Sequence, residues 1–244
     1  MEPGDRVDRM TTTDKPRTIR SFVLRAGRMT DAQEKAFDAL WDTYGLVCQH
    51  TRLDLVAAFG RDAPVILEIG FGMGDSLLTQ AIDEPERNFL GVEVHKPGVG
   101  RLMNEAKKAG VTNLRVLSED AVEVLADGFG PQSLAGVQIY FPDPWHKKRH
   151  HKRRLIQPEF VDLLAHRVAL GGFCHIATDW AAYAEWILEV FSQKAAWENT
   201  ADDGGFVDRP ARRPVTKFET RGTRLGHDVF DVVYLRKASD QHLQ

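Results

Sequence analysis

The sequence predicts an α/β fold in which a mostly parallel sheet is covered by helices on both faces. From about residue 64 onward, short apolar runs of strand length alternate with amphipathic stretches of helix length. A repeated strand–helix–strand order forms parallel strands joined by right-handed crossovers. The chain has 244 residues, 43% of them hydrophobic, which is enough for one large domain with a continuous core.

The segment before this alternation, residues 18–63, is expected to pack on the main domain as an N-terminal extension. Its run 19–25 predicts a short strand or an extended arm. Thr30 to Gln33 then fits a helix-capping box. Large apolar residues follow at helical spacing: Phe37, Leu40, Trp41 and Tyr44. Residues 1–17 mix both charge signs without an apolar run, which predicts a solvated tail and not a secretory signal.

The main domain is assigned to residues 64–238, followed by a short tail at 239–244. The expected strands are VILEIG (65–70), NFLGVEV (88–94), NLRVLSE (113–119), GVQIYF (136–141) and GFCHIAT (172–178). The expected helices span 75–82, 97–109, 121–125, 155–170 and 183–191.

The C-terminal part predicts an antiparallel addition to the sheet. Residues 199–215 are rich in Gly, Pro, Asp and Arg and predict a long surface loop. Two strand-like runs follow, TKFETRG (216–222) and HDVFDVVYLRK (227–237). The short connection between them is typical of a hairpin.

Composition excludes several classes of protein. No stretch approaches the roughly 20 apolar residues of a membrane-spanning helix. Cys48 and Cys174 are too few for a disulfide framework or a thiolate metal site, so we expect a reducing compartment, the cytoplasm. The net charge of −3 does not exclude a nucleic-acid partner, because charges screen each other beyond about 8–10 Å in physiological salt.

A glycine-rich turn formed by Gly70, Gly72 and Gly74 follows the first expected strand. In doubly wound folds, ligands bind at the carboxyl ends of the strands, and glycines there let the backbone approach the ligand closely. A purely structural tight turn is the alternative. The dinucleotide fingerprint needs a glycine where Asp75 stands, and a carboxylate there would repel a pyrophosphate. We therefore favour S-adenosylmethionine (AdoMet) over a dinucleotide.

Acidic residues stand at the ends of three successive expected strands. The first is Glu68, beside the glycine-rich turn. Glu93 ends the second strand about 20 residues later, where an acid accepts hydrogen bonds from ribose hydroxyls. Asp120 follows the third strand and is placed to receive an adenine amino group. The equal alternative for Asp120 is an N-cap for the next helix.

The fourth expected strand runs into an aspartate framed by prolines and then into a basic stretch. Pro142 and Pro144 fix the backbone on either side of Asp143, which the end of the strand directs at the same crevice. A simple turn aspartate is the alternative. Six cations follow within eight residues, either as a phosphate-binding surface or as a solvated face. The stretch contains Lys147, Lys148, Arg149, His150, His151, Lys152, Arg153 and Arg154. Its histidines have no carboxylate or cysteine partner at ligand spacing, so no metal is expected.

In order along the chain, the runs LEIGFGMG, GVEVHKPGVG, FPDPWHKKRHHKRR, ATDW and RPVTKFETRG resemble the bacterial tRNA (guanine-N7-)-methyltransferase family. The resemblance covers about residues 18 to 237, and the FPDPWHKKRH and RPVTKFE runs are highly specific. It implies the AdoMet-dependent methyltransferase (Rossmann-like) fold, a mostly parallel seven-stranded sheet whose last strand is antiparallel. It also implies methyl transfer to N7 of the variable-loop guanosine of tRNA, which gives 7-methylguanosine and S-adenosylhomocysteine (AdoHcy).

The same resemblance implies roles for individual residues. Asp143 would be catalytic. Asp143 would also bind AdoMet, together with Glu68, Glu93 and Asp120. The guanosine would contact Lys147, Asp179, Thr216, Lys217, Phe218 and Glu219. The RNA would contact Arg149, His150, His151, Lys152, Arg153 and Arg154.

The chemistry of N7 agrees with these roles. N7 carries a lone pair and no proton, so catalysis needs only positioning near 3 Å and a carboxylate, Asp143, that faces the developing cation. Asp179 and Glu219 would accept the N1–H and amino hydrogens of guanine, and Phe218 would stack on the base. The alternative for Asp179 is a helix cap, that for Glu219 is a charge on the face of a strand, and that for Phe218 is an aromatic side chain of the core.

Two rival functions stay open. A small-molecule methyltransferase would have no use for the basic stretch, and a non-catalytic AdoMet- or tRNA-binding module would not need Asp143. We expect tRNA as the partner, no membrane, no obligatory protein partner, and a monomer or homodimer.

Overall fold

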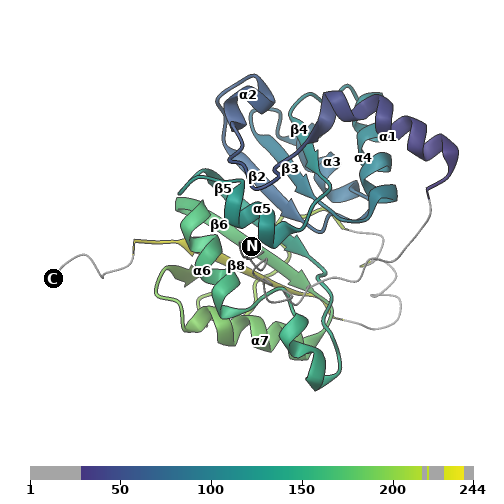
Figure 1. The fold of residues 1–244 in the computed structure, drawn as a ribbon. Coiled ribbons are helices and arrows are strands. Elements are labelled where there is room, and N and C mark those ends of the chain that lie inside the picture. Colours follow the sequence, from purple (N-terminus) through teal and green to yellow (C-terminus); the bar gives the residue numbers. More distant parts are fainter. Residues whose placement is uncertain (1–28, 216–218, 220–227, 239–244) are drawn as a thin grey trace, which may run out of the picture.

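The computed structural model describes residues 29–215, 219 and 228–238, which form one central sheet with helices on both sides (Figure 1). The strands are β1 (Gly45–Leu46), β2 (Val65–Ile69), β3 (Asn88–Val92), β4 (Leu114–Leu117), β5 (Leu134–Tyr140), β6 (Val168–Thr178), β7 (Trp197–Asn199) and β8 (Phe230–Arg236). They form an eight-stranded sheet in the order β1-β4-β3-β2-β5-β6-β8-β7. The pairs from β1 to β6 are parallel, whereas β8 is antiparallel to both β6 and β7. The expected mostly parallel, doubly wound fold is confirmed.

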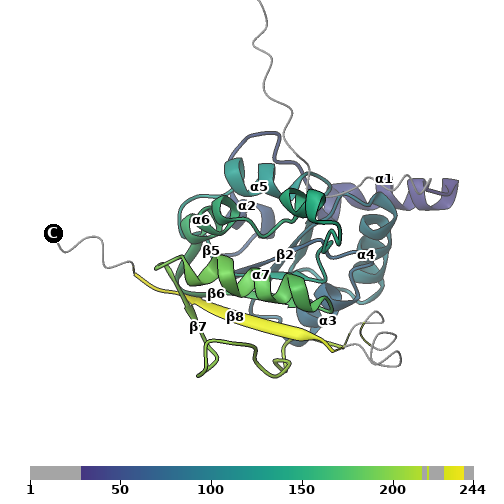
Figure 2. The same cartoon turned by 90° about the horizontal axis from the view of Figure 1, so that it is seen from below.

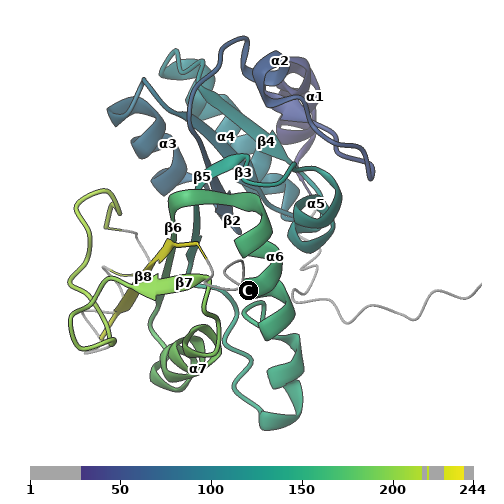
Figure 3. The ribbon, with the colours of Figure 1, turned by 90° about the vertical axis from the view of Figure 1, so that its left-hand side faces the viewer.

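Helices cover both faces of this sheet (Figure 3). They are α1 (Asp31–Tyr44), α2 (Leu55–Phe59), α3 (Asp75–Asp83), α4 (Lys96–Lys108), α5 (Ala121–Asp127), the 3₁₀ helix η1 (Lys148–Arg153), α6 (Pro158–Arg167) and α7 (Ala181–Ser192). Buried residues of α1, α3 and α4 pack on one face, and those of α5, α6 and α7 pack on the other. None of the helices in the described ranges is long and apolar enough to cross a membrane.

Burial on both faces explains why the central strands are continuous apolar runs. In β2, Val65, Leu67 and Ile69 pack in the core cluster of α5, α6 and α7, and Ile66 packs in that of α1, α3 and α4. The N-terminal helix joins the second cluster through Leu40 and Tyr44, and the Tyr44 hydroxyl donates to the carbonyl of Val111 at 3.0 Å. The division of the chain near residue 63 stays a prediction.

The described residues form eight strands, whereas seven were expected: two very short strands border the sheet, and the expected strand 216–222 is not among the eight. β1 adds a parallel edge beside β4, and β7 pairs with β8. The expected antiparallel addition to the sheet is therefore formed by β7 and β8, which are far apart in sequence and not joined by the short connection that was expected. The run 216–222 lies outside the described residues except for Glu219, which is helical and not extended. The runs 1–17, 19–25 and 239–244 also lie outside them.

Two other boundaries differ from expectation. The helix expected over 155–170 is α6, which ends at Arg167 because Val168 already begins β6. The segment expected to be a surface loop, 199–215, runs alongside β8 and contributes to the interior (Figure 2). Within it Val207 forms a β-bridge with Asp231, and Arg213 is fully buried.

Candidate active site

The glycine-rich turn lies at the carboxyl end of β2, where the chain enters α3. Gly70, Gly72 and Gly74 have φ angles of 74°, 57° and 80°, a left-handed conformation that side chains disfavour. Gly74 is also the N-terminal cap of α3. The three glycines thus let the backbone adopt a turn that residues with a side chain would disfavour.

Glu93 connects this turn to the next strand. Its two carboxylate oxygens accept hydrogen bonds from the backbone N–H of Gly72 and of His95, each at 2.9 Å. Each oxygen of a carboxylate has two lone pairs, so Glu93 keeps acceptor capacity for two hydroxyls. The expected ribose-binding acid is therefore oriented by the glycine-rich turn itself.

Helix α4 packs directly against the turn. A Cβ added at Gly98 would lie 1.9 Å from the carbonyl oxygen of Gly72. Arg101 on the same helix donates to the Met73 carbonyl at 2.5 Å and forms an ion pair with Asp75 at 2.6 Å. Asp75, which stands where the dinucleotide fingerprint requires a glycine, is thus paired with an arginine of α4.

At the end of β4, Asp120 caps α5, where its Oδ1 accepts the N–H of Val122 at 2.8 Å. The capping alternative is therefore correct for one oxygen of Asp120. Close by, the hydroxyl of Ser118 is buried and has no hydrogen-bond partner among the described residues. An orphaned buried hydroxyl beside a partly engaged carboxylate fits a polar ligand at this edge.

Glu68 is a buried carboxyl, only 3% exposed. Its Oε2 accepts from the Gln138 side-chain amide at 2.9 Å. Burial raises the pKa of Glu68 to about 8, the charge of Glu93 adds to this, and the Gln138 hydrogen bond opposes it. Glu68 therefore carries a proton at neutral pH unless a cation is bound nearby.

Asp143 lies in the loop after β5, and its side chain is exposed. The residues two positions before and after it, Phe141 and Trp145, have φ angles of 53° and 48°, which non-glycine residues rarely adopt. The N–H of Phe141 donates to the carbonyl of Ala177 on β6 at 2.8 Å, which fixes the start of the loop. Backbone held in a costly conformation on both sides of one carboxylate is typical of a functional site.

The basic stretch forms η1 and the residues beside it. Lys147, Lys148, Arg149, Lys152 and Arg153 are exposed, and His150 and His151 are half-buried. The Arg153 guanidinium lies 5.1 Å from the ring centroid of Trp145, and the His150 ring packs edge-on to the same indole. Arg153 and His150 thus lie against the Asp143 loop. No group of three His, Cys, Asp or Glu side chains among the described residues is arranged to hold a metal.

Arg154 differs from its neighbours, which corrects one expectation. Its side chain is buried, at 3% exposure, and its Nε donates to the Pro144 carbonyl at 2.9 Å. Its guanidinium also lies 4.8 Å from the Tyr183 ring centroid. Arg154 therefore supports the Asp143 loop from inside and does not present its charge to RNA phosphates.

Asp179 follows β6 at the same edge of the sheet and is exposed. The helix-cap alternative for Asp179 is wrong, because the cap of α7 is Trp180 and no side chain caps it. Trp180 is 39% exposed and packs edge-on against the ring of His146 at 4.2 Å. Lys147 and Asp179 are therefore open to the same edge. Thr216, Lys217 and Phe218 lie outside the described residues.

Glu219 is half-buried and binds Arg213 through both oxygens, at 2.6 and 3.0 Å. The strand-face alternative for Glu219 is wrong, because the residue is helical and held by a buried cation. The sequence reasoning missed Arg213, which it placed in a surface loop. It also missed the polar residues buried beneath this site, Gln138, Tyr140, His175 and Asp231. The sequence did contain a pattern that could have revealed them, because Gln138, His175 and Asp231 are polar residues within strand sequences that are otherwise apolar.

Known proteins resemble this chain in sequence over most of its length. The model of a family described as "Putative methyltransferase" matches residues 62–232. The tRNA (guanine-N(7)-)-methyltransferase of Pseudoalteromonas atlantica is 54% identical over 222 residues, covering 91% of this chain and 93% of that protein. The enzyme of the same name from Aeromonas hydrophila is 56% identical over 220 residues, covering 90% and 93%.

Solved structures support the fold alone. The 16S rRNA methyltransferase KamB has a TM-score of 0.51 at 14% identity and covers 86% of this chain and 95% of that one. The antibiotic-resistance methyltransferase Kmr has a TM-score of 0.52 at 14% identity and covers 77% and 93%. Identity above half over nine-tenths of the chain settles the family. This chain belongs to the bacterial tRNA (guanine-N7-)-methyltransferase family.

Proposed function

We propose that this AdoMet-dependent methyltransferase modifies N7 of a guanosine in the variable loop of tRNA. One observation carries the proposal. The exposed carboxylate of Asp143 lies on a loop whose backbone is left-handed two residues before and two residues after it. This loop follows β5 at the same edge of the sheet as the glycine-rich turn that follows β2, and the exposed cations of η1 come directly after it. A methyl-donor site and an RNA surface thus meet at one carboxylate.

The residues at the glycine-rich turn fit AdoMet. We assign the ribose to Glu93, the adenine to Asp120 and the Ser118 hydroxyl, and the positively charged methionine end to the side of Glu68. The close backbone approach comes from Gly70, Gly72 and Gly74. When bound, AdoMet supplies an electrophilic methyl group on a sulfonium. The orphaned Ser118 hydroxyl and the buried carboxyl of Glu68 are both explained by a polar, cationic ligand.

At N7 the protein needs no general base, because the nitrogen lone pair is already free. As the lone pair forms the bond to the methyl carbon, the carbon–sulfur bond breaks and sulfur keeps the electron pair. The purine then carries a positive charge. We assign its stabilisation to Asp143, and the binding of the guanine N1–H and amino group to Asp179 and Glu219. Lys147 would contact the same nucleotide, as would Thr216, Lys217 and Phe218.

The exposed cations of η1 would neutralise tRNA phosphates near the site. This surface separates the proposal from a small-molecule methyltransferase, which would have no use for it. The strained backbone around Asp143 separates it from a binding module without catalysis. We place the enzyme in the cytoplasm with its tRNA substrate, as a monomer or homodimer without an obligatory partner.

The test is transfer of label from methyl-labelled AdoMet to tRNA that lacks the modification, followed by nucleoside analysis. We expect label in 7-methylguanosine within the variable loop. Asp143→Asn keeps the size of the side chain and removes its charge, so single-turnover transfer at saturating AdoMet should slow by roughly 10²–10³ while tRNA binding changes little. Label in another nucleoside, or transfer by the variant at the wild-type rate, would contradict the proposal.

A further inference from the structure

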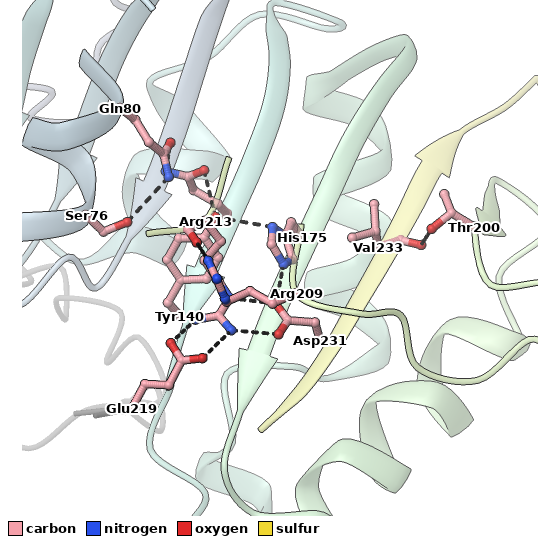
Figure 4. Close-up of polar contacts among 11 residues, drawn as sticks. Ser76, Gln80, Tyr140, His175, Thr200, Arg209, Arg213, Glu219, Asp231 and Val233 are labelled. Atoms are coloured by element: carbon pink, nitrogen blue, oxygen red, sulfur yellow. Dashed lines mark hydrogen bonds and ion pairs between the residues drawn. The ribbon is translucent and has the colours of Figure 1, made fainter. Parts of the chain in front are cut away.

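A buried charge cluster made of Arg213, Asp231 and Glu219 lies on the α3 side of the sheet (Figure 4). Arg213 Nε and Nη2 donate to the two oxygens of Asp231 at 2.7 Å each. Its Nη1 and Nη2 donate to the two oxygens of Glu219 at 2.6 and 3.0 Å. The side chains of Arg213 and Asp231 are 0% and 2% exposed. One guanidinium therefore holds two carboxylates in fixed, forked geometry.

Asp231 is itself fixed from the neighbouring strands. His175 Nε2 on β6 lies 2.7 Å from Asp231 Oδ1, and the Tyr140 hydroxyl on β5 lies 3.2 Å from His175 Nδ1. The Tyr140 hydroxyl also donates to Gln138 at 3.1 Å, and the Gln138 amide donates to Glu68 at 2.9 Å. A series of polar contacts thus extends from Glu68 to Glu219, in which the single hydroxyl hydrogen of Tyr140 serves either Gln138 or His175 at one time.

The cluster lies beneath the strand ends that carry the other proposed catalytic and guanosine-binding acids. Asp231 is in register with Ala177 on β6, two residues before Asp179. The Arg213 guanidinium is 5.8 Å from the ring centroid of Phe141, two residues before Asp143. Glu219 is therefore brought to the same edge of the sheet as Asp143 and Asp179, by a contact that originates in the interior.

The charges of the cluster do not cancel. Burial favours the neutral form of His175 and lowers its pKa, against the opposing effect of Asp231. Burial alone would raise the pKa of Asp231, but hydrogen bonds from His175 and Arg213 outweigh it and lower that pKa. With His175 neutral, one cation faces two carboxylates. The two carboxylates of the cluster therefore outnumber its guanidinium, and the charge of Arg212 acts on His175 and Tyr140 from outside the cluster.

We propose that Arg213 is a positioning residue for guanosine recognition: it fixes the carboxylate of Glu219 relative to the guanine that Glu219 binds. The proposal rests on the proposed function, in which Glu219 accepts the N1–H or amino hydrogens of the base. A carboxylate can accept about four hydrogen bonds, and Arg213 supplies two of those that Glu219 accepts. A misplacement of about 1 Å costs about 10²-fold in rate, so the fork geometry matters more than the charge.

The test compares two adjacent arginines. Arg213→Lys keeps the charge but loses the planar fork that spans both carboxylates. Arg212→Lys is the matched control, because Arg212 stacks on Phe173 at 3.6 Å from its centroid and its guanidinium is not part of the cluster. We expect Arg213→Lys to slow single-turnover methyl transfer to tRNA by about 10²-fold. AdoHcy affinity should stay at the wild-type value. Arg212→Lys keeps its charge and loses the stacking on Phe173, so it should slow transfer by less than about 10-fold.

A double substitution separates positioning from a general loss of structure. If Arg213 acts through Glu219, Arg213→Lys in a Glu219→Ala background should slow transfer no further, because nothing is left to position. Equal slowing in both backgrounds would overturn the proposal, as would a Glu219→Ala enzyme with the wild-type rate. If Arg213→Lys fails to bind AdoHcy, Asp231→Asn is tested in its place. It should slow transfer in the wild-type background and not in the Glu219→Ala background, and equal slowing in both would again overturn the proposal. A wild-type protein that transfers no label to tRNA would instead overturn the proposed function.

Discussion

Glu68 is the residue whose burial most directly connects stability with cofactor binding. Its carboxyl is fully buried and has one neutral hydrogen-bond donor, so ionising it in the free protein is costly. A bound cation removes that cost. The raised pKa of about 8 therefore predicts that AdoHcy and AdoMet, in the form whose amino group is positive, bind more tightly as pH rises toward 8 and displace a proton from Glu68.

The same pKa predicts the effect of Glu68→Gln on the free protein. Below the unfolded pKa of 4.5 the carboxyl is protonated in both states and contributes no penalty. Between 4.5 and about 8 the unfolded chain ionises and the folded protein does not, so the wild type loses up to about 1.4 kcal/mol per pH unit. Glutamine removes this loss. The variant should thus exceed the wild type in unfolding free energy by more at pH 8 than at pH 5.

Urea unfolding of both proteins at the two pH values, without cofactor, measures this difference. Calorimetry with AdoHcy provides the second readout, in which the variant should bind more weakly despite its greater stability. An equal gap in unfolding free energy at pH 5 and pH 8 would show that Glu68 is ionised in the folded protein.

At the scale of elements, α4 determines the shape of the glycine-rich turn. Alanine is favoured over glycine inside a helix by about 1 kcal/mol, so Gly98→Ala should stabilise α4 in isolation. Here the new methyl group would lie 1.9 Å from the Gly72 carbonyl and would have to push the turn away from the helix. We therefore expect Gly98→Ala to weaken AdoHcy binding by at least 10-fold, which is about 1.4 kcal/mol. Lys107→Ala, on the last turn of the same helix, is the control, and equal affinities for both variants would contradict the prediction.

The 3₁₀ helix η1 contains cations with two different tasks. Replacing the exposed Lys148, Arg149 and Lys152 with alanine should reduce the log–log slope of tRNA affinity against salt by up to about 2–3. Arg154→Met removes the same kind of charge from a buried position. It should leave the slope unchanged and lower the melting temperature, because the Pro144 carbonyl loses its donor. A slope that falls equally in both proteins would show that Arg154 reaches RNA.

For the molecule as a whole, sequence reasoning succeeded where structure is determined locally. The strands β2 to β6 are buried on both faces and read as apolar runs, and their order with the helices implied the parallel sheet. The glycine-rich turn and the acids at the strand ends could be predicted as well, because each directly follows a recognisable strand in the sequence. β1 and β7 were missed because two or three residues are too few for a recognisable pattern.

Arg213 was missed for a different physical reason. A segment rich in Gly, Pro, Asp and Arg has the composition of a solvated loop, and burial of its arginine depends on Asp231, 18 residues later. No local pattern contains that pairing. The sequence did contain the residues on the other side of this contact, which are polar residues at inward positions of β5, β6 and β8. Buried polar residues need hydrogen-bond partners, so they indicated that a polar side chain packs against them.

The last prediction concerns residues 1–17 and the overall charge. The protein has a net charge of −3, yet the proposed partner is a polyanion, so affinity must come from a local surface. Residues 1–17 contain four acidic and four basic side chains interspersed along the sequence, and charges this close to one another cancel within a Debye length of about 8 Å. A protein without residues 1–17 should therefore bind tRNA with the wild-type salt slope and bind AdoHcy with the wild-type affinity. The triple alanine variant of η1 is the reference for a reduced slope in the same titration. A slope reduced by about 1 or more on removal of these residues would mean that their arginines contact phosphates individually, and the RNA surface would then extend beyond η1.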